Sequence, residues 1–147
     1  MEQKFKIQGV WTLTRIDNNG KILDKEIKKN TIVNNGLNLV RDFLGDVAVN
    51  APKYIAIGTD GTGVANGDTE LYVETDRQLG TIDVATPYEV TFSYTFTFGG
   101  PATILEAGLF DNAIASGSTM FNRVTTSKVV SATINLIVDC TLTISRA

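Results

Sequence analysis

The stretch from Tyr88 to Leu109 constrains the fold most, because its first half alternates between apolar and polar residues. An extended chain places one set on one face, namely Val90, Phe92, Tyr94, Phe96 and Phe98. The opposite face then carries Glu89, Thr91, Ser93, Thr95 and Thr97. A period of two over this length predicts a half-buried β-strand. Gly99-Gly100-Pro101 ends the strand, and we expect a second strand to return from it as a hairpin.

The N-terminal third predicts a further hairpin. Residues 4–16 place four apolar side chains on one face, and we expect a β-bulge at Gly9 because Val10 interrupts the pattern. The segment 17–20, Asp-Asn-Asn-Gly, predicts a tight turn, followed by a strand from Lys21 to about Val33. That strand carries Lys25, Lys28 and Lys29. Two interpretations stay open, a defended sheet edge or an arm that reaches a neighbouring subunit.

One short helix is predicted after residue 36, where apolar residues recur at helical spacing and Gly45 supplies a C-cap, with the stripe Leu37, Val40, Phe43 and Leu44. A helix this short is marginal alone, so we expect its stripe to pack against the sheet. Further strands are predicted over 53–59, 77–86, 118–124 and 128–145. The last is long for one strand, so we expect a bend near Asn135 or a strand shared between two sheets.

These elements predict a single all-β domain over residues 1–147. Eight or so short strands with one helix favour an antiparallel β-sandwich with jelly-roll or Greek-key connectivity. A chain of 147 residues buries enough surface to fold without covalent cross-links. Residues 1–33 then form either an edge hairpin or an inter-subunit arm.

Composition excludes several function classes. A net charge of −3 and a pI near 4.9 argue against phosphate-neutralising nucleic-acid binding. The N-terminus lacks the apolar core of a secretory signal, and no apolar run reaches about 18 residues, so we expect neither export nor a membrane span. The chain has no histidine, which removes Ser-His-Asp catalysis and the commonest zinc ligand. We therefore expect no catalytic, cofactor-binding or metal-binding residue, and no enzyme.

Three features could in principle carry chemistry or ligand binding, and a structural interpretation is favoured for most of them. Cys140, the single cysteine, lies in an apolar run and reads as a buried thiol. The glycine-rich segment 58–68 lacks the Gly-Lys-Ser/Thr end of a Walker loop and the spacing of a calcium loop, so we expect a surface loop. Among the aromatic residues Trp11 reads as core, and Tyr72 is the surface ring best placed to stack on a sugar.

Glu106 stands in the middle of an apolar strand, where a carboxylate is costly unless it is paired. We expect either a pair with Arg77, because a guanidinium offers a bidentate fork to a carboxylate, or a capping contact with the backbone. Glu74 and Asp76 are competitors for Arg77. An alternative strand register would place Glu106 in water.

The order of these signals resembles a group of small virion proteins of tailed bacteriophages. The resemblance is carried by Asn30-Thr31-Ile32-Val33, Asn35-Gly36-Leu37, Tyr54-Ile55-Ala56-Ile57-Gly58-Thr59, Leu71, Glu74, Arg77 and Glu106-Ala107-Gly108-Leu109-Phe110. It spans the chain from Lys4 to Ile144. It implies a β-sandwich that oligomerises, commonly as a trimer, and that binds other virion proteins without catalytic residues.

The function expected from this resemblance is a capsid decoration, or cement, protein. It would bind the major capsid protein on the capsid exterior as a homotrimer, after assembly in the host cytoplasm. Edge strands and the N-terminal segment would pair across protomers. The alternative is a tail or tail-fibre component that contacts host glycan. A secreted carbohydrate-binding module and an enzyme rank behind both.

Overall fold

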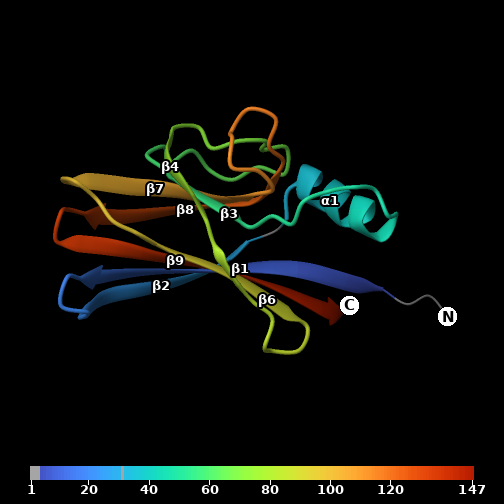
Figure 1. The fold of residues 1–147 in the computed structure, drawn as a ribbon, viewed down its shortest axis with the longest axis horizontal. Helices are drawn as coiled ribbons and strands as arrows, with labels where there is room; N and C mark the ends of the chain where they lie inside the picture. Colours follow the sequence, from blue (N-terminus) through green and yellow to red (C-terminus); the bar gives the residue numbers. More distant parts are fainter. Residues whose placement is uncertain (1–3, 31) are drawn as a thin grey trace.

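Two antiparallel sheets pack face to face, with one helix at one end of the sandwich, in the computed structural model of residues 4–30 and 32–147 (Figure 1). The five-stranded sheet has the order β2-β1-β9-β6-β5, with β1 Phe5–Asp17, β2 Ile22–Asn30, β5 Thr81–Asp83, β6 Glu89–Phe96 and β9 Ile134–Arg146. The four-stranded sheet has the order β4-β3-β7-β8, with β3 Tyr54–Gly58, β4 Glu74–Leu79, β7 Ala102–Phe110 and β8 Met120–Val130. The single helix in this part of the chain is α1, Asn34–Leu44. The predicted all-β sandwich with one short helix is confirmed.

The chain alternates between a hairpin within one sheet and a crossing to the other. Two expectations about connections are therefore corrected. β6 and β7 do not form a hairpin, because the break at 99–101 carries the chain between sheets. The segment 128–145 is two strands, since the chain turns at 131–133, where Ser131 pairs with Ile134. The two strands lie in different sheets, so two strands joined by a turn replace the predicted single strand shared between sheets.

Alternating side chains of both sheets meet in one aromatic and aliphatic core. The five-stranded sheet contributes Trp11, Leu13, Phe92, Phe96, Leu136, Val138 and Cys140, all buried. The four-stranded sheet contributes Ile55, Ile57, Ile104, Leu109 and Val124. Each such side chain stabilises the fold by roughly 1.5–3 kcal/mol on burial. The alternation of the central strand and the core position of Trp11 are thus confirmed.

The strand β1 runs without a bulge at Gly9, which corrects that prediction. Gly9 keeps the register with both neighbouring strands, and the irregularity between β1 and β2 falls between Arg15 and Ile16. A Cβ atom at Gly9 would lie 2.5 Å from Nδ2 of Asn122. A side chain at this position would force the amide of Asn122, from the opposite sheet, to move, so glycine suits the close approach of the two sheets.

The β1–β2 hairpin folds onto the chain's own sheet, with β1 inside the sheet and β2 at its edge. Gly20 takes a φ of 83° in the turn, and Oδ1 of Asp17 accepts hydrogen bonds from the backbone N–H groups of Asn19 and Lys21. Residues 1–3 and Thr31 of the predicted N-terminal unit lie outside the described residues. The described residues 4–30 form the edge hairpin, which is the first of the two interpretations, within the single chain.

Charged side chains close the side of the sandwich between β2 and β8. Asp24 accepts from Nε and Nη2 of Arg15 at 2.8 and 2.6 Å, and Nζ of Lys28 donates to the carbonyl of Thr125 at 2.5 Å. Nζ of Lys128 lies 3.7 Å from Oδ1 of Asp24. The hydrogen bond from Arg15 lowers the pKa of Asp24 below its ordinary value of 3.8. Inward-pointing charges of this kind protect an edge strand from pairing with other chains.

The helix α1 sits at the end of the sandwich instead of across a sheet face (Figure 1). Gly45 is its C-cap, as predicted, although the left-handed residue is the next one, Asp46, with a φ of 57°. The predicted packing of the apolar stripe is correct only for Val40, which is half-buried against the main core. Gly36 and Leu39 are the buried residues, whereas the stripe leaves three side chains exposed, namely Leu37, Phe43 and Leu44. An end position gives a helix only a narrow contact, here against β8.

Candidate functional site

Two loops cover the outer face of the four-stranded sheet, residues 59–73 between β3 and β4 and residues 111–119 between β7 and β8. A second, smaller core lies beneath them, formed by Val33, Ala56, Leu71, Phe110 and Met120. Ionisable side chains are buried beside this core. Since buried charges are retained only with partners, this region is the first place to look for chemistry.

Glu106 of β7 is fully buried and accepts hydrogen bonds from three backbone N–H groups. Its Oε2 atom accepts from Asp60 at 3.1 Å and from Val73 at 2.9 Å, and its Oε1 atom accepts from Tyr72 at 2.9 Å. Both ends of the 59–73 loop are therefore tied to one carboxylate. The prediction of a buried, paired Glu106 is correct, and the register that places it in water is not adopted.

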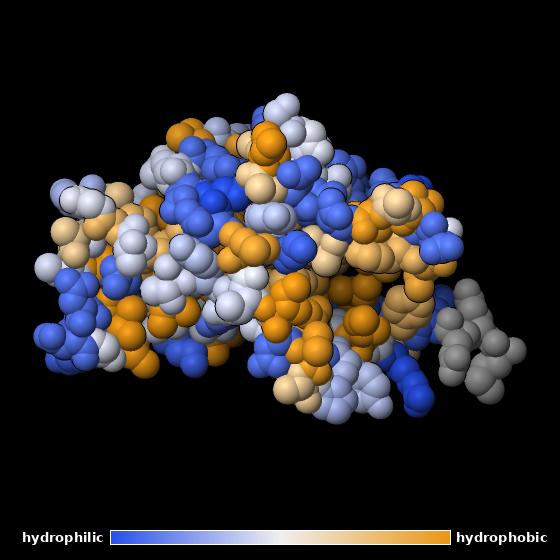
Figure 2. Space-filling view, in the orientation of Figure 1, coloured by the Kyte–Doolittle hydropathy of each residue, from blue (hydrophilic) through white to orange (hydrophobic). Residues whose placement is uncertain are grey.

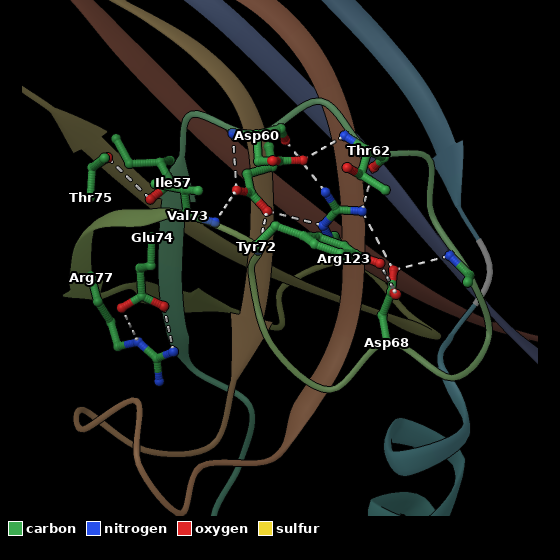
Figure 3. A network of polar contacts seen from close by, with 12 residues as sticks. Ile57, Asp60, Thr62, Asp68, Tyr72, Val73, Glu74, Thr75, Arg77 and Arg123 are labelled. Carbon is green, nitrogen blue, oxygen red and sulfur yellow. Dashed lines mark hydrogen bonds and ion pairs between the residues drawn. The ribbon is translucent and has the colours of Figure 1, made fainter.

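The partner of Glu106 is Arg123 of β8, not Arg77, which corrects the predicted pair. Nε of Arg123 donates to Oε1 of Glu106 at 3.1 Å, and neither side chain is exposed. Nη1 of Arg123 donates to the carbonyl of Thr62 at 2.7 Å and lies 3.5 Å from Oδ2 of Asp68. Figure 3 shows the guanidinium group of Arg123 surrounded by the loop. We call Glu106, Arg123 and these loop contacts the Glu106–Arg123 network.

Arg77 instead forms a bidentate pair with Glu74, one of the two competitors named from the sequence (Figure 3). The two hydrogen bonds measure 3.1 and 2.7 Å. Nη1 of Arg77 also donates to the carbonyl of Asn112 at 2.8 Å, and the guanidinium carbon lies 3.9 Å from the ring centroid of Phe110. Arg77 thus holds the 111–119 loop as Arg123 holds the 59–73 loop.

The buried charges of Glu106 and Arg123 hold the loop in place, which is a structural role. Each oxygen of Glu106 and each nitrogen of Arg123 has a hydrogen-bond partner, so none is left directed at a substrate. Within the described residues no three His, Cys, Asp or Glu side chains gather closely enough to hold a metal ion. Cys140 lies in the main core, where burial raises the pKa of its thiol to about 12. A thiol of that pKa stays protonated at neutral pH and is a poor nucleophile.

Tyr72 is half exposed, as expected, beside a shallow hollow of about 250 Å³ lined by Gly67, Asp68, Thr69 and Glu70. Its hydroxyl donates to Oδ1 of Asp68 at 3.3 Å. The negative charge of Asp68 raises the pKa of the Tyr72 phenol, so the ring remains neutral. The guanidinium carbon of Arg123 lies 4.6 Å from the ring centroid.

Several of the residues quoted for the sequence resemblance lie on this covered face, whereas Ile55, Ile57, Ala107 and Leu109 belong to the main core between the sheets. Glu106 anchors the network, Glu74 and Arg77 form the neighbouring pair, and Ala56 and Phe110 belong to the small core. These five residues belong to one structural unit, the outer face of the four-stranded sheet with its loops held down.

A different surface lies at the end of the sandwich below α1. A hollow of about 320 Å³ there has an entirely apolar lining, which includes Ile7, Val40, Phe43, Leu44, Ala51, Pro52, Ile82, Val90, Phe92, Phe121, Leu142 and Ile144. Figure 2 shows apolar side chains on both sides of the gap below the helix. Sequence reasoning missed this surface because it assigned the helix stripe to the core.

A second hollow of about 610 Å³ adjoins the first, and Ile144 lines both. Phe5 and Tyr88 line the second hollow together with charged residues on its rim, Glu89 and Arg146. Tyr88 has a φ of 65° and is 80% exposed. We call the exposed apolar side chains of both hollows the apolar end, and its members are Phe5, Phe43, Leu44, Ile82, Tyr88 and Ile144.

Arg123 was also missed from the sequence, although its signal is present. It stands in the apolar run Met120-Phe121-Asn122-Arg123-Val124, where a charged residue needs a buried partner as Glu106 does.

Comparison with known proteins adds no relative, because no family model, curated protein or solved structure matches the chain. In the described part of the chain no helix is both long and apolar enough to cross a membrane.

Proposed function

We propose that this chain is a non-enzymatic virion structural protein, a capsid decoration protein that binds the capsid exterior as a homotrimer and stabilises it. The observation that carries the proposal is the apolar end, where side chains of α1 and of three strands of the five-stranded sheet stay exposed together. An extended exposed apolar patch is a feature of proteins that assemble. The sequence resemblance to tailed-phage virion proteins supplies the context of that assembly.

The arrangement of charges supports a structural role. The Glu106–Arg123 network and the Arg77–Glu74 pair hold two long loops against a rigid sheet. A rigid protomer loses little conformational entropy when it binds, which favours many weak contacts repeated over a capsid surface. Binding to the assembled shell then stabilises that shell by mass action.

Co-sedimentation with empty, expanded capsids of a tailed phage tests the proposal. We expect saturable binding in whole-number ratios to capsomers, and capsids that resist heat better with the protein bound. Capsids in the unexpanded state and an unrelated β-sandwich protein of similar charge serve as controls. Absence of binding to expanded capsids would overturn the decoration proposal.

A tail or tail-fibre component that contacts host glycan is the second candidate, and the exposed Tyr72 favours it. One face of the ring is engaged by Arg123, and the exposed Glu70, which lines the same hollow, offers a carboxylate to sugar hydroxyls. A glycan array separates the candidates. Binding that is lost in Tyr72→Ala, without binding to capsids, would favour the tail role.

A further inference from the structure

The apolar end exposes more apolar surface than a monomer ordinarily does. Its aromatic and aliphatic side chains are each about half exposed or more, and together they present on the order of 700 Å². The largest apolar patch on a typical monomer is about 300–600 Å², whereas a standard interface covers about 800 Å² on each partner. We propose that the apolar end is the interface between copies of this chain, so that a second copy covers it.

The charges on the rim favour a second copy as the occupant. Glu89 and Arg146 have opposite signs and line the same hollow. Within the described residues neither has an ion-pair partner. In an interface between copies, Glu89 of one copy can pair with Arg146 of another, which fixes the register of the apolar contact.

The backbone at Tyr88 provides an independent observation. A φ of 65° places a large aromatic residue in the left-handed region, which non-glycine residues avoid because Cβ approaches a carbonyl oxygen. The conformation is held by the hydrogen bond from the N–H of Ile144 to the Tyr88 carbonyl, at 2.8 Å. The strain is not compensated by burial, since the ring is the most exposed of the large apolar side chains. Burial of the ring by a second copy supplies that compensation.

The other exposed edge is a poorer interface. The strand β2 also presents apolar side chains, including Ile27, but its opposite face carries Asp24, Glu26 and Lys28 in contact with β8. A strand with inward charges resists addition of another strand. The copies therefore meet at the apolar end and not through β2, which departs from the expectation of pairing edge strands.

This inference rests on the proposed function, because it names the surface through which the decoration protein self-associates. The two proposals fail separately. Self-association without capsid binding leaves the interface standing and removes the decoration role, whereas capsid binding by a strict monomer does the reverse.

Light scattering behind size-exclusion chromatography, over a wide range of concentrations, tests the interface. We expect the full chain to form trimers that dissociate on dilution. Leu44→Glu and Tyr88→Asn each weaken association by at least about tenfold, because a central contact is lost. Asparagine tolerates the left-handed backbone, so Tyr88→Asn keeps the fold. Ile27→Glu, an equally exposed apolar residue on β2, is the matched control and leaves association unchanged.

A charge swap tests the register independently. Glu89→Arg and Arg146→Glu each weaken association, and the double variant restores it, because the pair is re-formed with reversed signs. Circular dichroism and the unfolding midpoint confirm that each variant is folded. A chain that is monomeric at all concentrations overturns the inference. So does a chain whose association responds to Ile27→Glu and not to Leu44→Glu, or one in which the double swap fails to restore it.

Discussion

The Glu106–Arg123 network and the apolar end both depart from the usual rule that charged side chains are exposed and large apolar side chains are buried. In the network two charged side chains are fully buried, whereas at the apolar end large hydrophobic side chains remain in water. The network has a complete set of hydrogen-bond partners, and its loops are closed over it. Over the apolar end lies no element from the described residues of the same chain, 4–30 and 32–147.

This difference separates structure from interaction. A buried ion pair with every partner in place is a finished site, and removing one member leaves an uncompensated charge. An exposed apolar surface does not stabilise the monomer, because burial of its side chains lowers the free energy only when a partner binds. We therefore expect substitutions in the network to change folding stability and substitutions at the apolar end to change association.

The largest effect is expected for Glu106→Gln. The substituted amide keeps the shape but cannot accept from three backbone N–H groups and also neutralise Arg123, so the free energy of unfolding falls by about 3–5 kcal/mol. Urea denaturation of a dilute, monomeric sample measures it. Glu70→Gln, at an exposed carboxylate in the same loop, is the matched control with little effect. A loss below about 1 kcal/mol would show that the network does not hold the loop.

Arg77→Lys is expected to have an intermediate effect. Lysine retains the charge but loses the bidentate contact to Glu74 and the stacking on Phe110, so the free energy of unfolding falls by about 1–2 kcal/mol. Proteolysis within residues 111–119 should accelerate in parallel, since the loop loses the bond to the carbonyl of Asn112. An unchanged cleavage rate would contradict the assignment of Arg77 as the residue that holds this loop.

Asp24→Asn tests the charged side between β2 and β8 and is expected to cost less than about 1 kcal/mol, because the carboxylate is partly exposed. The pKa of Asp24 is lower in the folded state than in the unfolded state, so its contribution is complete above pH 3.8 and disappears as the pH falls below it. The stability difference between wild type and variant should shrink over that range. A difference that grows on acidification would reverse the inferred sign.

The smallest effect on stability is expected for Leu44→Ser at the apolar end. The side chain is 75% exposed, so the free energy of unfolding of the monomer should change by no more than about 0.5 kcal/mol. Urea denaturation at low concentration measures it. A loss of several kcal/mol would mean that Leu44 belongs to the monomer's core, and the contrast between the two regions would fail.

The alternation of residues was enough to predict the sandwich and its aromatic core, but it could not locate every strand break. Val130 and Ile134 are separated by an even number of positions, so the turn at 131–133 preserves the phase of the pattern. Periodicity alone therefore predicts one continuous strand over residues 128–145, where the structure has the end of β8, a turn and most of β9. The sequence likewise could not show that β6 and β7 lie in different sheets, because a connection between sheets and a hairpin have similar turn residues.

The candidate site was predictable in part. A carboxylate in an apolar strand required a partner, and Glu106 has one. The choice between Arg77 and Arg123 depended on strand order, since β3 separates β4 from β7 whereas β8 pairs with β7 directly, and Gly108 faces Arg123. The helical stripe at Phe43 and Leu44 was visible too. Its exposure followed from the position of α1 at the end of the sandwich, which local sequence does not specify.

Amide hydrogen exchange at low and at high protein concentration tests the central contrast most directly. At the concentration where copies associate, we predict added protection over residues 40–52, 82–90 and 142–146, and none over residues 59–73, which the Glu106–Arg123 network already holds in the monomer. Added protection confined to residues 22–30 would place the contact at β2. That result, or unchanged exchange at the apolar end of an associated sample, would contradict the account.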